Sequence, residues 1–173
     1  QLDLFLIHWP VPSQDRYVEA WKTLVELKNA GRIRSIGVSN FNTDHLERII
    51  NETGVVPVMN QIELHPRFQQ RAARLFHARH HIVIESWSPL GRGRLLDDPA
   101  IGRIATKHGR SPAQVILAWH LAQGLVVIPK SARKERMAEN LASASLRLAP
   151  EDLAAIDALD AADGRTGFDP ALA

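Results

Sequence analysis

Five apolar stretches of this sequence each run into residues whose side chains can bind or orient a small molecule. Those stretches end at His8–Trp9, Ser39–Asn40, Gln61–Glu63, Ser86–Trp87–Ser88 and Lys130–Ser131. An imidazole can give or take a proton, side-chain amides donate and accept hydrogen bonds, and an indole offers a flat stacking face. A lone histidine in such a place is more often structural, yet the same pattern at five ends indicates a binding or catalytic site.

The stretch IPKSARKERMAEN, residues 128–140, has the composition of an anion-binding site. Lys130 and Ser131 leave an apolar stretch, and a helix is predicted to begin within a few residues of them. The free N–H groups of a helix N-terminus attract anions, and nearby cationic side chains add to that attraction. The cations that follow could instead form a solvated helix face, namely Arg133, Lys134 and Arg136. The presence of Lys130 and Ser131 at the end of the apolar stretch favours a phosphate site.

Two other patterns carry weaker signals. GRGR, residues 91–94, is too short to be a glycine-rich dinucleotide fingerprint. The three histidines of HARHH, residues 77–81, have a spacing that could hold a metal. They end a predicted helix, where cations are favoured anyway, and no partner carboxylate is evident, so we predict no metal site. Trp21 and Trp119 lie on apolar helical stripes and are expected to be core residues.

The order of apolar and polar residues predicts strands that alternate with helices. Strands are expected near 2–8, 34–39, 57–63, 82–87 and 125–129. Helices are expected over 15–30, 43–53, 71–79, 100–108, 112–123, 131–141 and 149–160. Such alternation predicts right-handed crossovers and a parallel sheet. Because parallel strands end at the same edge, one face should collect His8, Asn40, Gln61, Trp87 and Lys130.

The repeat length separates two α/β architectures. A (β/α)8 TIM barrel of ~250 residues spends ~31 residues on each strand–helix unit, and the spacing here is close to that. Five such units make about five-eighths of a barrel. We therefore expect residues 1–173 to be a single-domain fragment with the last five βα units and a C-terminal tail. A doubly wound sheet is the alternative. The opening QLDLFLI reads as a strand buried on both faces, which indicates the C-terminal part of a longer protein. We therefore expect Leu4, Leu6 and their neighbours to lack a sheet partner on one side within this chain.

The bulk composition is that of a soluble globular protein, since 45% of the residues are hydrophobic and 23% are charged. A net charge of +2 gives no case for a nucleic-acid or membrane-surface protein. No apolar stretch approaches the ~20 residues of a bilayer-spanning helix. The absence of cysteine fits a cytoplasmic protein without disulfides.

Five blocks of the sequence together resemble the aldo-keto reductases, in order and spacing, over all 173 residues. They are DLFLIHWP, GRIRSIGVSNF, NQIELHP, ESWSPLGRG and IPKSARKERMAENL. The likeness is greatest to bacterial members of the 2,5-diketo-D-gluconate reductase type, partly because Trp87 stands where many relatives carry tyrosine. The resemblance implies a (β/α)8 barrel that binds NADPH without a Rossmann fold. It also implies reduction of a small aldehyde or ketone by hydride transfer, in a protein that is monomeric when complete.

The resemblance implies a role for each strand end. His8 would orient the substrate carbonyl, and Trp9 would form a wall of its pocket. The implied NADPH contacts are Ser39, Asn40 and Gln61 at the carboxamide, Trp87 stacked on the nicotinamide, Ser88, Leu90 and Gly91 over the pyrophosphate, Lys130, Ser131 and Arg136 at the 2′-phosphate, and Glu139 and Asn140 at the adenine. The cationic group at the 2′-phosphate implies a preference for NADPH over NADH.

One part of the family pattern has no match in this chain. The family's proton-donating tyrosine, with its lysine and aspartate, comes from the first strands and loops. The only tyrosine, Tyr17, lies on a predicted amphipathic helix and matches nothing catalytic. Two alternatives therefore stay open: a subunit or truncation that binds NADP without turnover, and a different barrel enzyme that uses the phosphate site for a sugar phosphate.

Overall fold

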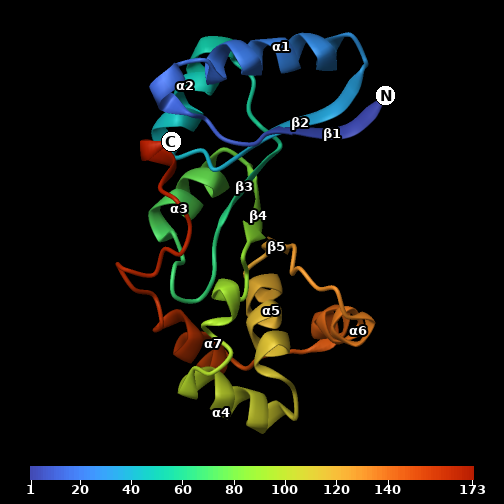
Figure 1. Ribbon diagram of the computed structural model, residues 1–173, viewed down its shortest axis with the longest axis vertical. Helices are drawn as coiled ribbons and strands as arrows, with labels where there is room; N and C mark the ends of the chain where they lie inside the picture. Colours follow the sequence, from blue (N-terminus) through green and yellow to red (C-terminus); the bar gives the residue numbers. More distant parts are fainter. The chain divides into compact units, whose positions relative to one another are not determined.

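The computed structural model describes residues 1–173 and has strands that alternate with helices (Figure 1). The strands are β1 (Leu2–Ile7), β2 (Ile33–Ser39), β3 (Met59–Glu63), β4 (Val83–Trp87) and β5 (Val126–Val127). The helices are α1 (Tyr17–Asn29), α2 (Thr43–Thr53), α3 (Arg71–Arg79), α4 (Pro99–His108), α5 (Pro112–Ala122), α6 (Lys134–Ala142) and α7 (Pro150–Asp157). The predicted elements are confirmed, except that β5 is shorter than expected, since Pro129 has no N–H to extend a ladder.

The strands lie in the sheet in chain order, β1-β2-β3-β4-β5. β1 pairs with β2 in parallel, with Leu4 opposite Ser35, and β2 pairs with β3 in parallel, with Val38 opposite Asn60. The predicted α/β class with a parallel sheet is therefore confirmed.

The chain divides into two compact units, which are described separately below. The first unit comprises Gln1–Ile62, Gln70–Glu85 and Gly167–Ala173, and the second comprises Glu63–Gln69 and Ser86–Thr166. No helix in either unit is both long and apolar enough to cross a membrane.

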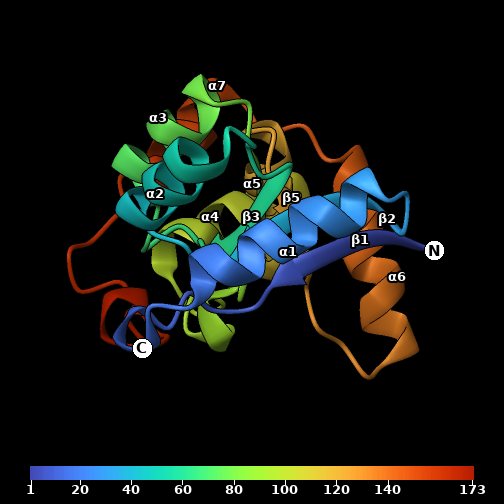
Figure 2. The same cartoon turned by 90° about the horizontal axis from the view of Figure 1, so that it is seen from above.

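The core of the first unit forms where α1 and α2 pack on the sheet. Figure 1 shows β1 and β2 side by side beneath α1, and Figure 2 shows α1 lying across them. Trp21, Ile36, Leu46 and Ile49 are fully buried there, and the Trp21 Nε1 donates to the Thr53 Oγ1 at 3.2 Å. The prediction that Trp21 is a core residue is confirmed.

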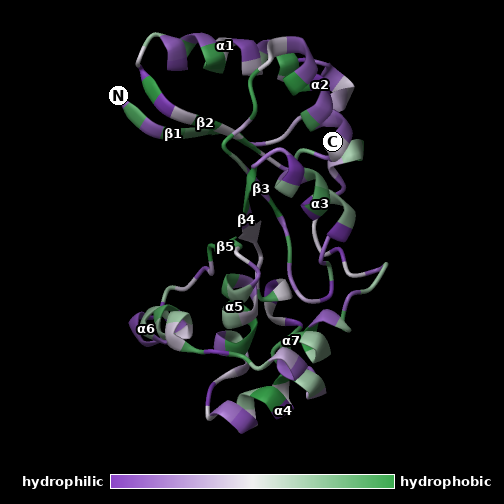
Figure 3. Cartoon of the chain, turned by 180° about the vertical axis from the view of Figure 1, so that it is seen from behind, coloured by the Kyte–Doolittle hydropathy of each residue, from purple (hydrophilic) through white to green (hydrophobic).

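The strand β1 is the edge of the sheet within this chain, because its one neighbour is β2. Its side chains stay accessible although they are apolar: Leu2, Leu4 and Phe5 are 50%, 44% and 44% exposed, and Figure 3 shows hydrophobic residues along this strand. The expectation that β1 has no partner on one side within this chain is confirmed. An apolar edge of this kind favours association with another segment.

The second unit is organised around α5, which is buried along almost its whole length. Ser111 begins the helix with a capping box, in which its Oγ accepts from the Gln114 N–H at 3.3 Å. Trp119 is fully buried, as predicted, and its Nε1 donates to the Asp157 Oδ1 at 2.7 Å, which joins α5 to the end of α7. A bond from the Gln114 Nε2 to the Glu139 carbonyl, 3.0 Å long, joins the first turn of α5 to the middle of α6.

Candidate functional site

In the first unit, hydrogen bonds join the ends of β1, β2 and β3. The Asn40 Nδ2 donates to the His8 carbonyl at 3.0 Å and contacts the Ser39 Oγ at 3.2 Å. The Ser39 Oγ donates to the Gln61 carbonyl at 2.8 Å, and the Asn40 N–H donates to the same carbonyl at 2.9 Å. Four residues from three of the predicted strand ends therefore form one hydrogen-bonded group.

The conformation of Asn40 explains how it reaches the neighbouring strand. Its φ is 61°, in the left-handed region that asparagine tolerates better than most residues. The chain thus turns sharply at the end of β2 and holds the buried Asn40 side chain between β1 and Ser39. An asparagine is well suited here because it combines this backbone conformation with a short amide donor.

The orientation of the Gln61 amide is set by Glu85, a residue that the sequence analysis missed. The Gln61 Nε2 donates to the Glu85 Oε2. Because the Nε2 is used in this way, the Gln61 Oε1 stays available as an acceptor at the end of β3. Glu85 could have been noticed, since it is the lone charged residue in the apolar stretch HIVIESW.

The His8 side chain lies at the end of β1 without a hydrogen-bond partner for its ring. It is exposed, and its ring centroid lies 6.2 Å from that of Trp9. An accessible imidazole beside a half-buried indole can donate a hydrogen bond to a bound molecule while the indole packs against it.

In the second unit, a cavity of about 260 Å³ gathers most of the residues predicted to contact the phosphate and adenine ends of a cofactor. The predicted residues in its lining are Leu90, Lys130, Ser131, Arg136, Glu139 and Asn140. Its other lining residues are Leu96, Ser111, Pro112 and Ala113, which sequence reasoning missed because they come from separate segments.

The charge of this cavity suits an anion. Lys130 and Arg136 are exposed, and neither takes part in the ion pairs of the unit, which join other residues. The Ser131 Oγ accepts from the Arg133 N–H at 3.2 Å, so it shapes the turn that leads into α6. Two cations without partners beside a helix start form the kind of site that binds phosphate.

The loop after β4 adopts a tight turn in the second unit. Ser88 and Gly91 have φ values of 49° and 56°, and the Gly91 N–H donates to the Ser88 carbonyl at 2.8 Å. A Cβ on Gly91 would lie 2.9 Å from the Leu95 Cδ1, so this position requires glycine for both conformation and space. Trp87, just before the turn, is half-buried, and its carbonyl accepts from the Leu64 N–H at 3.4 Å.

The site residues thus fall into two groups, one in each unit. His8, Trp9, Ser39, Asn40 and Gln61 lie in the first unit. The second unit holds Trp87, Ser88, Leu90, Gly91, Lys130, Ser131, Arg136, Glu139 and Asn140. Their convergence on one face stays a prediction.

The histidines of residues 77–81 do not form a metal centre. His77 is buried, its Nδ1 lies 2.6 Å from the Ala73 carbonyl and its Nε2 lies 3.0 Å from the Asn60 Nδ2. Both ring nitrogens are therefore used within the fold, and burial lowers the pKa of His77. His80 stacks on Phe76 with ring centroids 4.3 Å apart. No group of three potential metal ligands occurs in the chain.

Residues 1–161 match the Aldo/keto reductase family. Among curated relatives, "Methylglyoxal reductase DkgA" of Escherichia coli (strain K12) is 52% identical over 171 residues, which are 98% of this chain and 62% of that protein. An aldo-keto reductase of Mycolicibacterium smegmatis is 50% identical over 169 residues and is covered to 61%. This chain therefore spans about three-fifths of the length of the curated relatives that it matches.

Solved structures agree in both fold and sequence. The apo form of Gox0644 superposes with a TM-score of 0.96 at 62% identity, and the match covers 98% of this chain and 62% of that one. A variant of Gox0644 in complex with NADPH gives a TM-score of 0.97 at 61% identity, with 99% and 64% covered. The chain belongs to the aldo/keto reductase family.

Proposed function

We propose that this chain carries the cofactor site and the carbonyl-orienting histidine of an NADPH-dependent reductase that converts aldehydes or ketones to alcohols. The observation that carries the proposal is the cavity of the second unit, where six residues predicted from sequence lie together. Membership of the family and the NADPH complex of the similar Gox0644 variant support the same cofactor. We propose also that the five strand–helix units belong to a (β/α)8 barrel.

The preference for NADPH follows from Lys130 and Arg136. Both side chains line the cavity as cations without partners, and a 2′-phosphate carries nearly two negative charges near neutral pH. Charge-assisted hydrogen bonds are roughly twice as strong as neutral ones. Uncharged ribose would gain little from the same two side chains, so NADH should bind much more weakly.

The first unit would hold the nicotinamide end. When bound, NADPH supplies the hydride. The Gln61 Nε2 donates to Glu85, which leaves the Gln61 Oε1 as an acceptor. This oxygen can accept a hydrogen bond from the amide of the nicotinamide carboxamide. Ser39 and Asn40, fixed by their bonds to Gln61 and His8, would complete this contact. Fixed polar groups of this kind select one orientation of a bound ring, and orientation can contribute several kcal/mol to catalysis.

His8 would orient the substrate. Its exposed imidazole can donate a hydrogen bond to a carbonyl oxygen, with Trp9 beside it as an apolar wall. The substrate class is then a small aldehyde or ketone, and the name of the similar DkgA makes methylglyoxal a suitable test compound.

Protonation of the product needs a group that we do not find in these 173 residues. The only tyrosine, Tyr17, is buried in the core, and its hydroxyl accepts from the Arg48 guanidinium at 3.3 Å. This observation favours one alternative: on its own, the 173-residue chain binds NADPH and does not turn over.

The test is a titration of the 173-residue protein with NADPH, followed by quenching of tryptophan fluorescence, and then addition of methylglyoxal. We expect saturable binding and no loss of nicotinamide absorbance. Failure to bind NADPH would contradict the proposed cofactor site. Steady consumption of NADPH would contradict the proposal that this chain does not turn over, and it would leave the cofactor site intact. Stronger binding of a sugar phosphate than of NADPH would favour the other barrel chemistry.

A further inference from the structure

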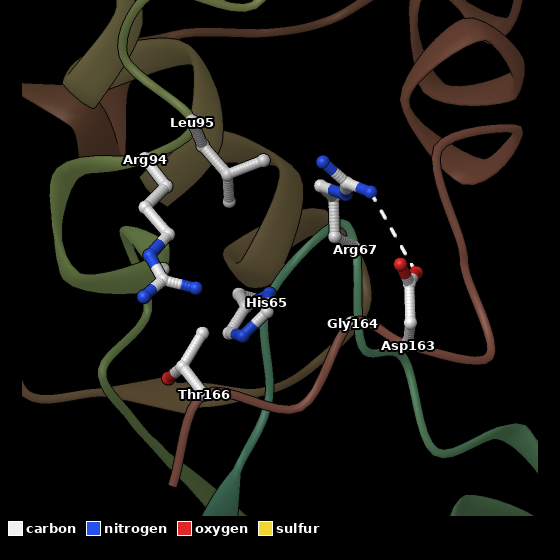
Figure 4. Close-up of a pocket in the computed structure, with 8 residues that line it drawn as sticks. His65, Arg67, Arg94, Leu95, Asp163, Gly164 and Thr166 are labelled. Atoms are coloured by element: carbon white, nitrogen blue, oxygen red, sulfur yellow. Dashed lines mark ion pairs between the residues drawn. The ribbon is translucent and has the colours of Figure 1, made fainter.

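A second cavity in the second unit contains polar groups that the proposed function does not use. It has a volume of about 150 Å³, room for several water molecules. Two arginines, Arg67 and Arg94, line it together with His65, Asp163 and Thr166 (Figure 4). Figure 4 shows the two guanidinium groups on either side of the His65 ring.

The floor of this cavity is a buried histidine with one unsatisfied nitrogen. The His65 side chain is 1% exposed, and its Nε2 lies 3.2 Å from the Glu63 Oε1. The Thr166 N–H donates to the same oxygen at 2.7 Å, and the Thr166 hydroxyl also donates to it. The Glu63 Oε1 is thus an acceptor, which requires the His65 Nε2 to carry the hydrogen.

In an uncharged imidazole with its hydrogen on Nε2, the Nδ1 is a bare acceptor. The His65 Nδ1 is buried and has no hydrogen-bond partner in the protein. A buried polar atom without a partner is costly and uncommon, and it frequently marks a place for a bound molecule. Because His65 lines the cavity, we expect a ligand there to offer the Nδ1 a hydrogen-bond donor.

The rim supplies positive charge. Arg94 is exposed and takes part in none of the ion pairs of the unit. Arg67 lies 3.7 Å from Asp163, but both side chains are exposed, at 51% and 86%. An exposed pair at this distance contributes little, so Arg67 can turn to a ligand. The ligand should carry negative charge as well as a donor hydrogen.

We propose that this cavity binds inorganic phosphate, with its charged oxygens on Arg94 and Arg67 and its hydroxyl hydrogen donated to the His65 Nδ1. Near neutral pH, phosphate keeps at least one hydrogen, whereas sulfate has the same shape and none. This cavity is distinct from the one that contains Lys130 and Arg136, although the loop 90–96 contributes residues to both. Gly91, which the family resemblance assigns to the pyrophosphate, also lines it.

The test is calorimetric titration of phosphate and of sulfate into the Arg136→Ala variant, which weakens the other candidate phosphate site. In that background, Arg94→Gln should weaken phosphate binding roughly tenfold or more. Arg92→Gln is the matched control, because Arg92 is an exposed cation of the same loop and does not line the cavity. It should leave phosphate binding unchanged.

His65→Gln tests the acceptor, because a glutamine amide can still donate to Glu63 while the Nδ1 acceptor is lost. We expect phosphate to bind roughly two- to tenfold more weakly to this variant, and its advantage over sulfate to disappear. Equal effects of Arg94→Gln and Arg92→Gln would overturn the proposal. Equal affinities for phosphate and sulfate before the His65 change would overturn it as well.

Discussion

Replacing Gly164 by alanine should destabilise the second unit severely, because two backbone segments meet at this residue. A Cβ on Gly164 would lie 1.7 Å from the Arg67 carbonyl oxygen, whereas ordinary contact begins near 3.4 Å. The segments would have to separate by about 1.7 Å, the difference between these distances. That movement breaks the Ala161 N–H bond to the Arg67 carbonyl, 3.1 Å long, and weakens the Thr166 bonds to buried Glu63.

The magnitude follows from the bonds that are lost. One backbone hydrogen bond contributes about 1 kcal/mol, and a bond to a charged group contributes about 1.5–3 kcal/mol. We therefore expect Gly164→Ala to lower the free energy of unfolding by about 3–5 kcal/mol, a large part of the roughly 5–15 kcal/mol of a typical domain.

The assay is urea denaturation, with Gly102→Ala as the control. Gly102 lies within α4, and a Cβ there would meet nothing within 4 Å. Alanine is favoured over glycine in a helix, so this control should gain about 0.5–1 kcal/mol. The two glycine substitutions should thus shift the denaturation midpoint in opposite directions. A Gly164→Ala protein as stable as the original would refute the close approach of the two segments.

Three further predictions concern stability. Burial lowers the pKa of His77, so the folded state binds fewer protons than the unfolded state, and stability should fall as the pH is lowered from about 7 to about 5. In His77→Gln, the midpoint of urea denaturation should depend less steeply on pH. An unchanged slope would contradict the contribution of His77 to the pH dependence of stability. Ser111→Ala should lower the free energy of unfolding by about 1 kcal/mol, measured by urea denaturation, because α5 loses its N-terminal cap. An unchanged free energy would count against a stabilising role of this cap. Burial raises the pKa of Asp152, but its bonds to His108 and Lys107 outweigh this and lower it. The carboxylate of Asp152 then stabilises the fold above about pH 4, and this stabilisation is lost as the pH falls further. Asp152→Asn should therefore lower the free energy of unfolding more at pH 7 than at pH 3. Equal losses at the two pH values would argue against these bonds.

Local signals explain why the sequence predicts most elements. Ser111 followed by proline begins α5, and Asn42 and Gly54 bound α2 as a cap and a left-handed stop. The cavity of the second unit was also partly predictable, because five of its residues lie within the stretch 128–140. Residues within one short segment lie close together in space, regardless of how the rest of the chain folds.

Contacts between distant segments could not be predicted in this way. Thr166 donates to Glu63 across 103 residues, and the Gln69 N–H donates to the Asp160 Oδ1 across 91 residues. Neither pair leaves a periodic or spacing pattern, since each depends on how the chain returns on itself. The phosphate cavity floored by His65 depends on the first of these contacts, so it became visible only in three dimensions.

The cofactor preference is the central claim, and the affinity of the protein for NADPH and NADH tests it most directly. Both cofactors are titrated by tryptophan quenching against the original chain, Arg136→Ala and Arg133→Ala. Arg133 is the matched control, since it is an exposed cation of the same stretch and does not line the cavity. Because a hydrogen bond to a charged group contributes about 1.5–3 kcal/mol, Arg136→Ala should weaken NADPH by about one to two orders of magnitude. NADH should barely change, and Arg133→Ala should leave both cofactors unaffected. Equal losses of affinity for NADPH and for NADH in Arg136→Ala would contradict the assignment of Arg136 to the 2′-phosphate.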